Sequence, residues 1–422
     1  MQIDRRPYNY PKRRGPSCLA IVLFIGLGIL GISLGANANT VIDAIIPTPT
    51  PEPTRSAASY ATSASLYWRD GDYESAIRSY ENAVLLDSTN AKYYVDLINL
   101  YTLNGDVEGA LTAAEKVILL SPNDDSVLSA VASAYLLNGD RLSEIGDRAE
   151  ADLRYQEAID SARLAIQADP NNAEAYAYLA GGLIRQDRDN YVEAQEMVDT
   201  AVALNPQSAI VRYYRAIVLE NQGYYQLAIE EYEQARQLDP NFADASLALA
   251  YTYFYTDNRA RAINVLRQLI ENQPNDPDLY DALGWMLFLA GQYPEAESYL
   301  EDAVALDPNM VRAQAHLGAA YYKNFNYELA IPQLEEAVAA YEAAYQDGIL
   351  LTDSTALYFN YLGFAYYRTD PSLCYETRPP YQYTAVQMFE RVLEAMGPDG
   401  IRGQNAQVGL DECRQYNLGS GQ

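Results

Sequence analysis

Residues 281–308, DALGWMLFLAGQYPEAESYLEDAVALDP, contain two apolar-rich segments separated by a short polar turn. In the second segment, Ala296, Leu300 and Ala303 are four and three residues apart, so they fall on one face of a helix. Gly291 in the turn is suited to the left-handed backbone that closes a helix at its C-terminus. Pro308 cannot continue the second helix. The stretch therefore predicts a hairpin of two amphipathic helices.

The same hairpin pattern recurs along most of the chain. The alanine equivalent to Ala296 returns at Ala76, Ala110, Ala158, Ala194, Ala228, Ala262, Ala330 and Ala385. Five of the eight intervals are 34 residues, a period too short for a domain and suited to one helical hairpin. Tight polar turns are expected at Asp70-Gly71-Asp72, Asn104-Gly105-Asp106, Asn138-Gly139-Asp140, Gln222-Gly223-Tyr224 and Ala290-Gly291-Gln292.

These repeats resemble the tetratricopeptide repeat family. Unit seven carries the family's pattern at Tyr280, Leu283, Gly284, Leu287, Tyr293, Ala296, Leu300, Ala303 and Pro308. Units one and eight match it at Ala64, Tyr67, Gly71, Tyr73, Ala76, Tyr80 and Ala83, and at Leu317, Gly318, Tyr321, Tyr327, Ala330, Leu334 and Ala337. The resemblance covers about residues 57–396. It implies an all-α superhelical solenoid of about nine hairpins, with a concave groove lined by the first helix of each repeat.

Three regions depart from the regular repeat. A 14-residue insertion at 140–153, in unit three, predicts about two extra helical turns on each arm of that hairpin. The long arm is either a partner contact or simply an elongated solenoid hairpin. In the irregular last repeat, 356–396, residues 370–383 replace the short turn. Residues 397–422 are expected to form a C-terminal cap helix and a tail.

The net charge of −28 is unevenly distributed along the chain. Residues 1–16 hold five of the 29 basic side chains and one of the 57 acidic ones, which leaves 24 and 56 in the other 406 residues, a net of −32. Such an acidic body repels phosphate backbones, so nucleic-acid binding is not expected. The basic tip at 1–16 favours a cytoplasmic location for the N-terminus.

The run from Cys18 to Ala36 is uncharged and apolar, and its 19 residues span about 28 Å as a helix, close to the thickness of a bilayer core. We therefore expect a transmembrane signal-anchor helix at 17–37, in a bacterial protein whose body lies outside the cytoplasm. The alternative is a secretory signal that is cleaved near Ala38, which would release the body as a secreted protein. Both interpretations export the repeats.

Two further features lie beside this segment. Gly31 and Gly35 form a small-xxx-small motif that lets membrane helices approach closely, so a homodimer through this segment is a weak alternative to a single anchor. Residues 38–56 are rich in Pro and Thr and favour an extended linker. We interpret the linker as a stalk that holds the repeats off the lipid.

Residue types that serve most catalytic chemistry are scarce. The chain has one histidine, His316, and three cysteines, so it lacks the residues for a usual zinc site or a disulfide-dense scaffold. No phosphate loop or nucleophile motif is present, so we expect no enzyme activity, no cofactor and no metal. The acidic pairs Glu230-Glu231, Glu335-Glu336 and Asp124-Asp125 are expected on solvated helix faces or turns.

Cys374 and Cys413 lie in adjoining elements of the expected C-terminal region. In an exported protein such a pair favours a disulfide bond. Two buried free thiols are the alternative.

The first helices of units five to nine carry large side chains at the positions that line the groove in this family. These predicted groove residues are Tyr213, Ile217, Leu247, Tyr251, Phe254, Trp285, Phe288, Tyr322, Phe364 and Tyr367. Units one to four have small or polar residues there instead, at Ala61, Ser65, Asn99, Ser129, Ser133, Ala177 and Gly181. The groove is therefore expected to have a smooth half and an aromatic half. Either the aromatic side chains are exposed for binding, or they pack against one another.

The sequence favours a non-enzymatic interaction scaffold, anchored in the membrane, that binds an apolar or basic peptide or protein segment in the concave groove. The alternative is an envelope protein that binds cell-wall glycan or another polysaccharide, because aromatic faces also stack on sugar rings. The nature of the ligand separates the two.

Overall fold

The structure is a computed structural model that describes residues 55–144, 146–346 and 351–420. These ranges contain 19 α-helices and two short 3-10 helices, and no strands. The expected basic tip at 1–16, the anchor at 17–37 and nearly all of the linker lie outside the described residues. Among the helices that are described, none is both long and apolar enough to span a bilayer.

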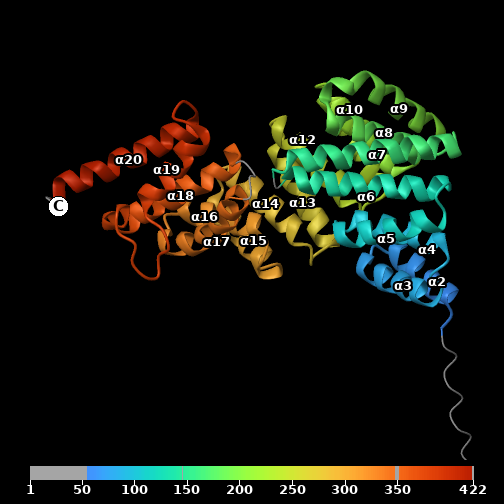
Figure 1. The fold of residues 1–422 in the computed structure, drawn as a ribbon, viewed down its shortest axis with the longest axis horizontal. Coiled ribbons are helices and arrows are strands. Elements are labelled where there is room, and N and C mark those ends of the chain that lie inside the picture. The colour runs from blue at the N-terminus through green and yellow to red at the C-terminus, as the bar shows by residue number, and fades with distance from the viewer. Residues whose placement is uncertain (1–54, 145, 347–350, 421–422) are drawn as a thin grey trace, which may run out of the picture. The chain divides into compact units, whose positions relative to one another are not determined.

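The helices follow one another as nine antiparallel pairs and a last single helix (Figure 1). The first five pairs are α2 (Ala57–Arg69) with α3 (Tyr73–Leu86), α4 (Ala91–Leu103) with α5 (Val107–Leu120), α6 (Asp125–Glu144) with α7 (Arg148–Ala168), α8 (Ala173–Gln186) with α9 (Tyr191–Leu204), and α10 (Ala209–Asn221) with α11 (Tyr225–Leu238). The remainder are α12 (Ala243–Tyr255) with α13 (Arg259–Asn272), α14 (Pro277–Leu289) with α15 (Tyr293–Leu306), α16 (Val311–Lys323) with α17 (Tyr327–Gln346), α18 (Asp353–Thr369) with α19 (Ala385–Met396), and α20 (Ile401–Ser420). The expectation of an all-α array of hairpins is confirmed.

Glycine followed by aspartate closes one helix and starts the next. Gly71 and Gly105 have φ of 80° and 71°, in the left-handed region where a side chain is strained. The following aspartates, Asp72 and Asp106, accept hydrogen bonds from the backbone N–H groups of Ser75 and Gly109. Each aspartate therefore caps the second helix of its pair.

The turn of the third hairpin is not at Asn138-Gly139-Asp140, so that prediction is wrong. Gly139 lies inside α6 and is buried. A Cβ at this position would be 2.5 Å from Cε1 of Tyr155, so glycine is there because α7 packs closely against α6. The left-handed glycine of this turn is Gly146, with φ of 90°, and Asp147 caps α7. Both arms, 20 and 21 residues long, exceed the 13 and 14 residues of α4 and α5.

Small residues bring the two helices of a pair into contact. The alanine at the repeated position is fully buried in every pair, as Ala262 and Ala296 illustrate. Gly284 on α14 faces Leu300 on α15, and Gly318 on α16 faces Leu334 on α17 in the same manner. The core is made of several hydrophobic clusters along the array, of which the three largest extend over successive pairs.

The array curves so that its sixth repeat meets the first two. Gly71, in the first hairpin turn, lies so near Asn241 that a Cβ would be 2.3 Å from the amide nitrogen Nδ2 of Asn241. Leu103, at the end of α4, packs with Phe242 and Ala245 at the start of α12. The concave side of repeats one to six is consequently closed in by protein.

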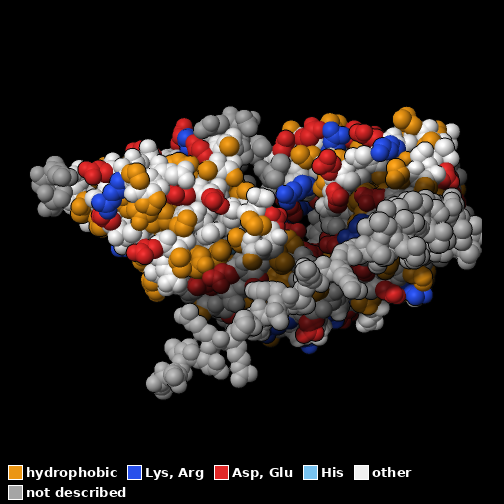
Figure 2. Space-filling view, turned by 90° about the horizontal axis from the view of Figure 1, so that it is seen from below, with side chains coloured by type: hydrophobic (Ala, Val, Ile, Leu, Met, Phe, Trp, Pro, Cys, Tyr) orange, Lys and Arg blue, Asp and Glu red, His pale blue; other side chains and the backbone are white. Residues whose placement is uncertain are grey.

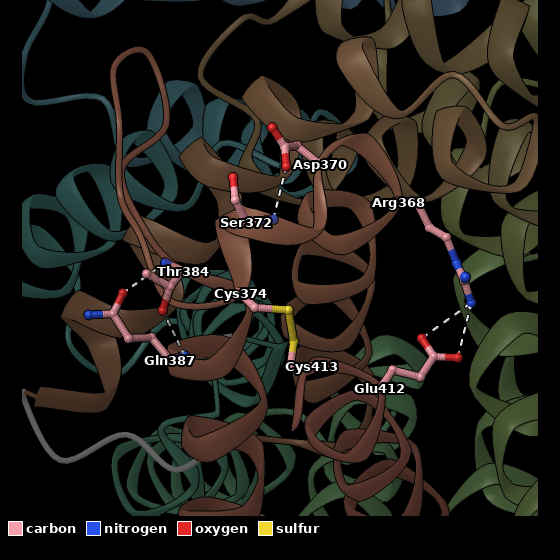
Figure 3. The surroundings of a disulfide bond; sticks show 8 residues. All are labelled: Arg368, Asp370, Ser372, Cys374, Thr384, Gln387, Glu412 and Cys413. Atoms are coloured by element: carbon pink, nitrogen blue, oxygen red, sulfur yellow. Dashed lines mark hydrogen bonds and ion pairs between the residues drawn. A yellow bond between two sulfur atoms is a disulfide. The ribbon is translucent and has the colours of Figure 1, made fainter. Parts of the chain in front are cut away.

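The last repeat is fastened to the cap helix. Its long connection contains the 3-10 helix η2 (Pro371–Cys374), and Cys374 forms a disulfide with Cys413 of α20, with the two Cα atoms 5.7 Å apart (Figure 3). Arg368 of α18 pairs with Glu412, the neighbour of Cys413 in α20. The end of the array is thus joined both covalently and by an ion pair.

Candidate functional site

A cavity of about 160 Å³ opens on the concave side of the first six repeats. We call it the N-terminal cavity. The side chains that line it come from α2, α4, α6, α8, α10 and the start of α12. They include Trp68, Asn99, Leu103, Ser133, Leu137, Asp140, Glu174, Tyr178, Arg185, Tyr213, Tyr214, Phe242 and Asp244. The prediction of a smooth half in this region is therefore wrong, because aromatic and charged side chains line it.

Several residues that line the cavity lie one helical turn beyond positions that the sequence places on the groove face. Ala61 and Ser65 were expected on the groove face of α2, and Trp68 is the next position at helical spacing. In the same way, Ser133 leads to Leu137 and Asp140, and Gly181 leads to Arg185. Continuing each stripe by one turn would have found these residues. Phe242 and Asp244 had no such signal, since curvature alone brings them to the cavity.

The positively charged side chain in the cavity lining, Arg185, is paired with a carboxylate. Arg185 Nε lies 2.6 Å and 2.9 Å from the two carboxylate oxygens of Asp140. Tyr155 also donates its hydroxyl to Asp140, at 2.9 Å, and the Arg185 guanidinium lies over the ring of Tyr214, at 5.5 Å. These contacts make the Asp140–Arg185 pair a fixed part of the wall.

Two carboxylates of the cavity have no such partner. Glu174 and Asp244 make no hydrogen bond or ion pair with any described residue. Loss of solvent raises the pKa of Glu174. Solvent reaches the Asp244 side chain, yet the protein around it removes enough water from the carboxylate to raise its pKa to about 7. The nearby charges of Asp140, Asp276 and Glu144 act in the same direction, and that of Arg185 opposes them.

The predicted groove residues are partly covered. Phe288 is buried, and the other nine have intermediate exposure. Tyr213 lines the N-terminal cavity, where it lies 5.0 Å from the rings of Tyr214 and Phe242. Farther along, the rings of Tyr322 and Tyr361 stack at 4.8 Å, and Phe364 meets the ring of Phe389 edge-on. The two alternatives therefore both apply in part, because the rings contact one another and remain partly exposed.

His316 belongs to a network in repeats seven and eight, in which His316 and Asp281 are buried. Its Nδ1 atom lies 2.6 Å from the carboxylate of Asp281, and its ring stacks on Trp285 at 4.1 Å. Arg312 Nε binds the other Asp281 oxygen at 2.8 Å. Burial alone would raise the pKa of Asp281, but His316 and Arg312 together hold it below its usual value. His316 is thus a packed residue.

The long hairpin of repeat three reaches this network. Glu144, at the end of α6, lies 3.8 Å from Arg312 of α16. Arg312 also pairs with Asp278 at 2.5 Å. The arm therefore makes a contact between repeats that are far apart in the sequence.

The acidic pairs differ in their surroundings. Glu335 is buried, accepting hydrogen bonds from the Tyr366 hydroxyl and from the backbone N–H of Gln382, so its expected solvation is wrong. Glu231 pairs with Arg212 and Arg215. Over the described ranges, no group of three or more His, Cys, Asp or Glu side chains is arranged to hold a metal ion. Figure 2 shows acidic side chains scattered among hydrophobic ones on one face of the molecule.

Family models described as tetratricopeptide repeat match residues 67–134, 179–241, 219–286, 277–310 and 311–348. Together these matches cover more than half of the chain. The chain is a tetratricopeptide repeat protein. The matches at 277–310 and 311–348 correspond to the pairs α14–α15 and α16–α17, and the other matches begin within helices.

Curated relatives match the tetratricopeptide repeats over part of the chain. The photosystem I assembly protein Ycf3 of Synechococcus sp. (strain CC9605) is 28% identical over 141 residues, 29% of this chain and 82% of that protein. The general transcriptional corepressor ssn6 of Schizosaccharomyces pombe is 30% identical over 125 residues, 29% of this chain and 11% of ssn6. The TPR repeat-containing protein YpiA of Bacillus subtilis is 25% identical over 146 residues, 35% of this chain and 34% of YpiA. The chain thus spans about a third or less of the length of ssn6 and YpiA.

Two solved structures resemble this one more loosely. Yeast Tom70 has a TM-score of 0.43 at 13% identity, covering 86% of this chain and 88% of Tom70. A monomeric mutant of IFIT1 has a TM-score of 0.49 at 15% identity, covering 86% and 83%.

Proposed function

We propose that this tetratricopeptide repeat protein is a non-enzymatic scaffold that binds a segment of another protein on its concave face. The observation that carries the proposal is the row of partly exposed rings on successive first helices, with Tyr251 on α12, Trp285 on α14, Tyr322 on α16 and Tyr361 on α18. Aromatic side chains with an apolar body and accessible edges are typical of protein-binding surfaces. Hydrophobic side chains in an acidic surrounding suit an apolar or basic segment.

A glycan ligand receives less support from the same rings. Trp285 stacks on Phe288 at 4.7 Å and on His316 at 4.1 Å, with interplanar angles of 8° and 11°. Tyr322 stacks on Tyr361. These contacts engage ring faces on which a sugar would stack, whereas a peptide also uses ring edges and polar atoms.

We further propose that the repeats stand outside the cytoplasm of a bacterium, held at the membrane by the segment at 17–37. The supporting observations are the apolar run and the basic tip in the sequence. The Cys374–Cys413 disulfide also supports this location, since such bonds persist in oxidising compartments. Alkaline extraction separates an anchored chain from a released one, and protease added to intact spheroplasts should digest the repeats. Repeats protected from protease would reject the proposed side of the membrane.

The binding surface is tested by crosslinking in native membranes, followed by mass spectrometry. The Tyr251→Glu, Trp285→Ala double variant should lose the partners that crosslink to the unchanged protein. The control is Tyr225→Glu, which places the same charge on an exposed tyrosine of α11, a second helix of its pair. Full recovery of every partner by the double variant would contradict binding at these residues. Binding that survives protease treatment of the ligand would instead favour the glycan alternative.

A further inference from the structure

The N-terminal cavity presents more negative than positive charge to its interior. Its one cation, Arg185, is held by both oxygens of Asp140. Glu174 and Asp244 remain without a cationic partner among the described residues. Unpaired carboxylates in a partly desolvated site are costly, and a bound cation offsets that cost.

A second feature of the cavity is the side chain of a buried tyrosine whose hydroxyl has no hydrogen-bond partner among the described residues. Tyr214 is 7% exposed and lines the cavity, and its hydroxyl makes no hydrogen bond with any described residue. The Tyr214 side chain is held in place by its burial, while its hydroxyl has no protein partner and can accept a hydrogen bond from a ligand in the cavity. An ammonium or guanidinium group has N–H donors for both a hydroxyl oxygen and a carboxylate.

The size and the remaining walls of the cavity restrict what fits. Its volume of about 160 Å³ is near the ~150 Å³ of a cavity that holds one benzene molecule. Trp68, Tyr178 and Phe242 add aromatic surface to the lining. Aromatic faces attract cations and also pack against the carbon stem that carries them. The space therefore suits the end of one long, positively charged side chain.

We propose that the N-terminal cavity binds the cationic end of a lysine or arginine side chain that belongs to the bound protein segment. The carboxylates of Glu174 and Asp244 face the charge, the Tyr214 hydroxyl accepts one of its hydrogens, and Trp68 covers the stem. The assignment of this side chain to a bound protein segment rests on the proposed function. A pocket that selects for positive charge would then lie in repeats one to six, apart from the aromatic row on α12 to α18.

The two tryptophans of the chain allow each surface to be observed separately. The chain contains only Trp68 and Trp285. In a Trp285→Phe background, the emission of Trp68 reports on the N-terminal cavity. In a Trp68→Phe background, Trp285 reports on the aromatic row. The probe is a five-residue glycine peptide with one central lysine, and its control carries norleucine, which keeps the carbon stem and removes the charge. Both are titrated into the full-length chain in detergent micelles.

The lysine peptide should shift the Trp68 emission in a saturable manner and bind about tenfold or more tightly than the norleucine peptide. Glu174→Gln combined with Asp244→Asn should weaken the lysine peptide by about the same factor. Glu230→Gln, on the exposed face of α11, removes a charge that does not line the cavity and should change nothing. Equal binding of the two peptides, or unchanged binding by the double variant, would overturn the inference.

Folding and function are controlled separately. Circular dichroism tests whether the isosteric variants keep their helices, and Tyr214→Phe provides a milder change that should also weaken binding of the lysine peptide. If membrane crosslinks depend on Tyr251 and Trp285 while Trp68 gives no response, this inference fails and the proposed function stands. If Trp68 responds but the Tyr251→Glu, Trp285→Ala variant keeps its crosslinks, the cavity binds cations. The proposal that the cation belongs to a bound protein segment is then rejected.

Discussion

Gly284 lets α14 pack directly on α15, and we expect Gly284→Ala to destabilise the protein. An added Cβ would lie 2.5 Å from Cγ and 2.8 Å from Cδ2 of Leu300, and 3.3 Å from the carbonyl oxygen of Ala296. Helix propensity alone would favour alanine by about 1 kcal/mol. Overpacking a filled site costs ~1–3 kcal/mol, and the upper half of that range applies because a backbone atom is also in the way. The expected net loss is ~1–2 kcal/mol.

Urea unfolding, followed through the emission of the neighbouring Trp285, measures this loss. Leu300→Ala alone should cost ~2–5 kcal/mol, because it opens a cavity in the core. In the double variant, the new methyl group enters that cavity without a clash. The double variant should therefore be at least ~1 kcal/mol more stable than the sum of the single effects predicts. Gly318, which faces Leu334 in the next pair, should behave likewise. A higher urea midpoint for Gly284→Ala, or strict additivity, would refute the close approach of these helices.

Three further predictions concern other parts of the chain. Alkylation without reductant should leave Cys374 and Cys413 unlabelled, and replacing both with serine should lower the free energy of unfolding by up to about 4 kcal/mol for a separation of 39 residues; two labelled thiols would reject the bond. Asp244 has a folded-state pKa of about 7 against an ordinary value of 3.8, so the folded state holds more protons between these values and stability falls as pH rises across them. Asp244→Asn should therefore raise the urea midpoint at pH 8, and this gain should vanish towards pH 4; a gain independent of pH would contradict the assignment. Glu335→Ala leaves two donors without their acceptor and should cost ~2–3 kcal/mol in the same assay, more than Tyr366→Phe does.

Local sequence predicts the hairpins well because each one is specified by its own residues. The repeated alanines give the period, and glycine-aspartate pairs such as Gly71-Asp72 mark the turns by backbone conformation and capping. Gly139 shows the limit of this reasoning. A glycine in a polar context predicts a turn equally well whether it ends a helix or, as here, makes room for Tyr155.

The site could be predicted only in part, because curvature is a property of the whole array. The helical stripes place Ser133 and Gly181 on the concave face, and the next turn of each stripe reaches the N-terminal cavity. The contact of Leu103 with Phe242 has no local signature, since it depends on small rotations that accumulate over four repeats. The partial cover of the aromatic row has the same origin.

The disulfide at the end of the array decides where unravelling begins. A stack of repeats that contact mainly their neighbours opens from its ends, where a terminal helix has a partner on one side only. At the C-terminal end, α20 cannot peel away, because Cys413 ties it to Cys374 across α19. At the other end, α2 has a single buried residue, Ala64, and no covalent tie. A pull on the chain through the linker would thus detach α2 first and leave the last repeat intact.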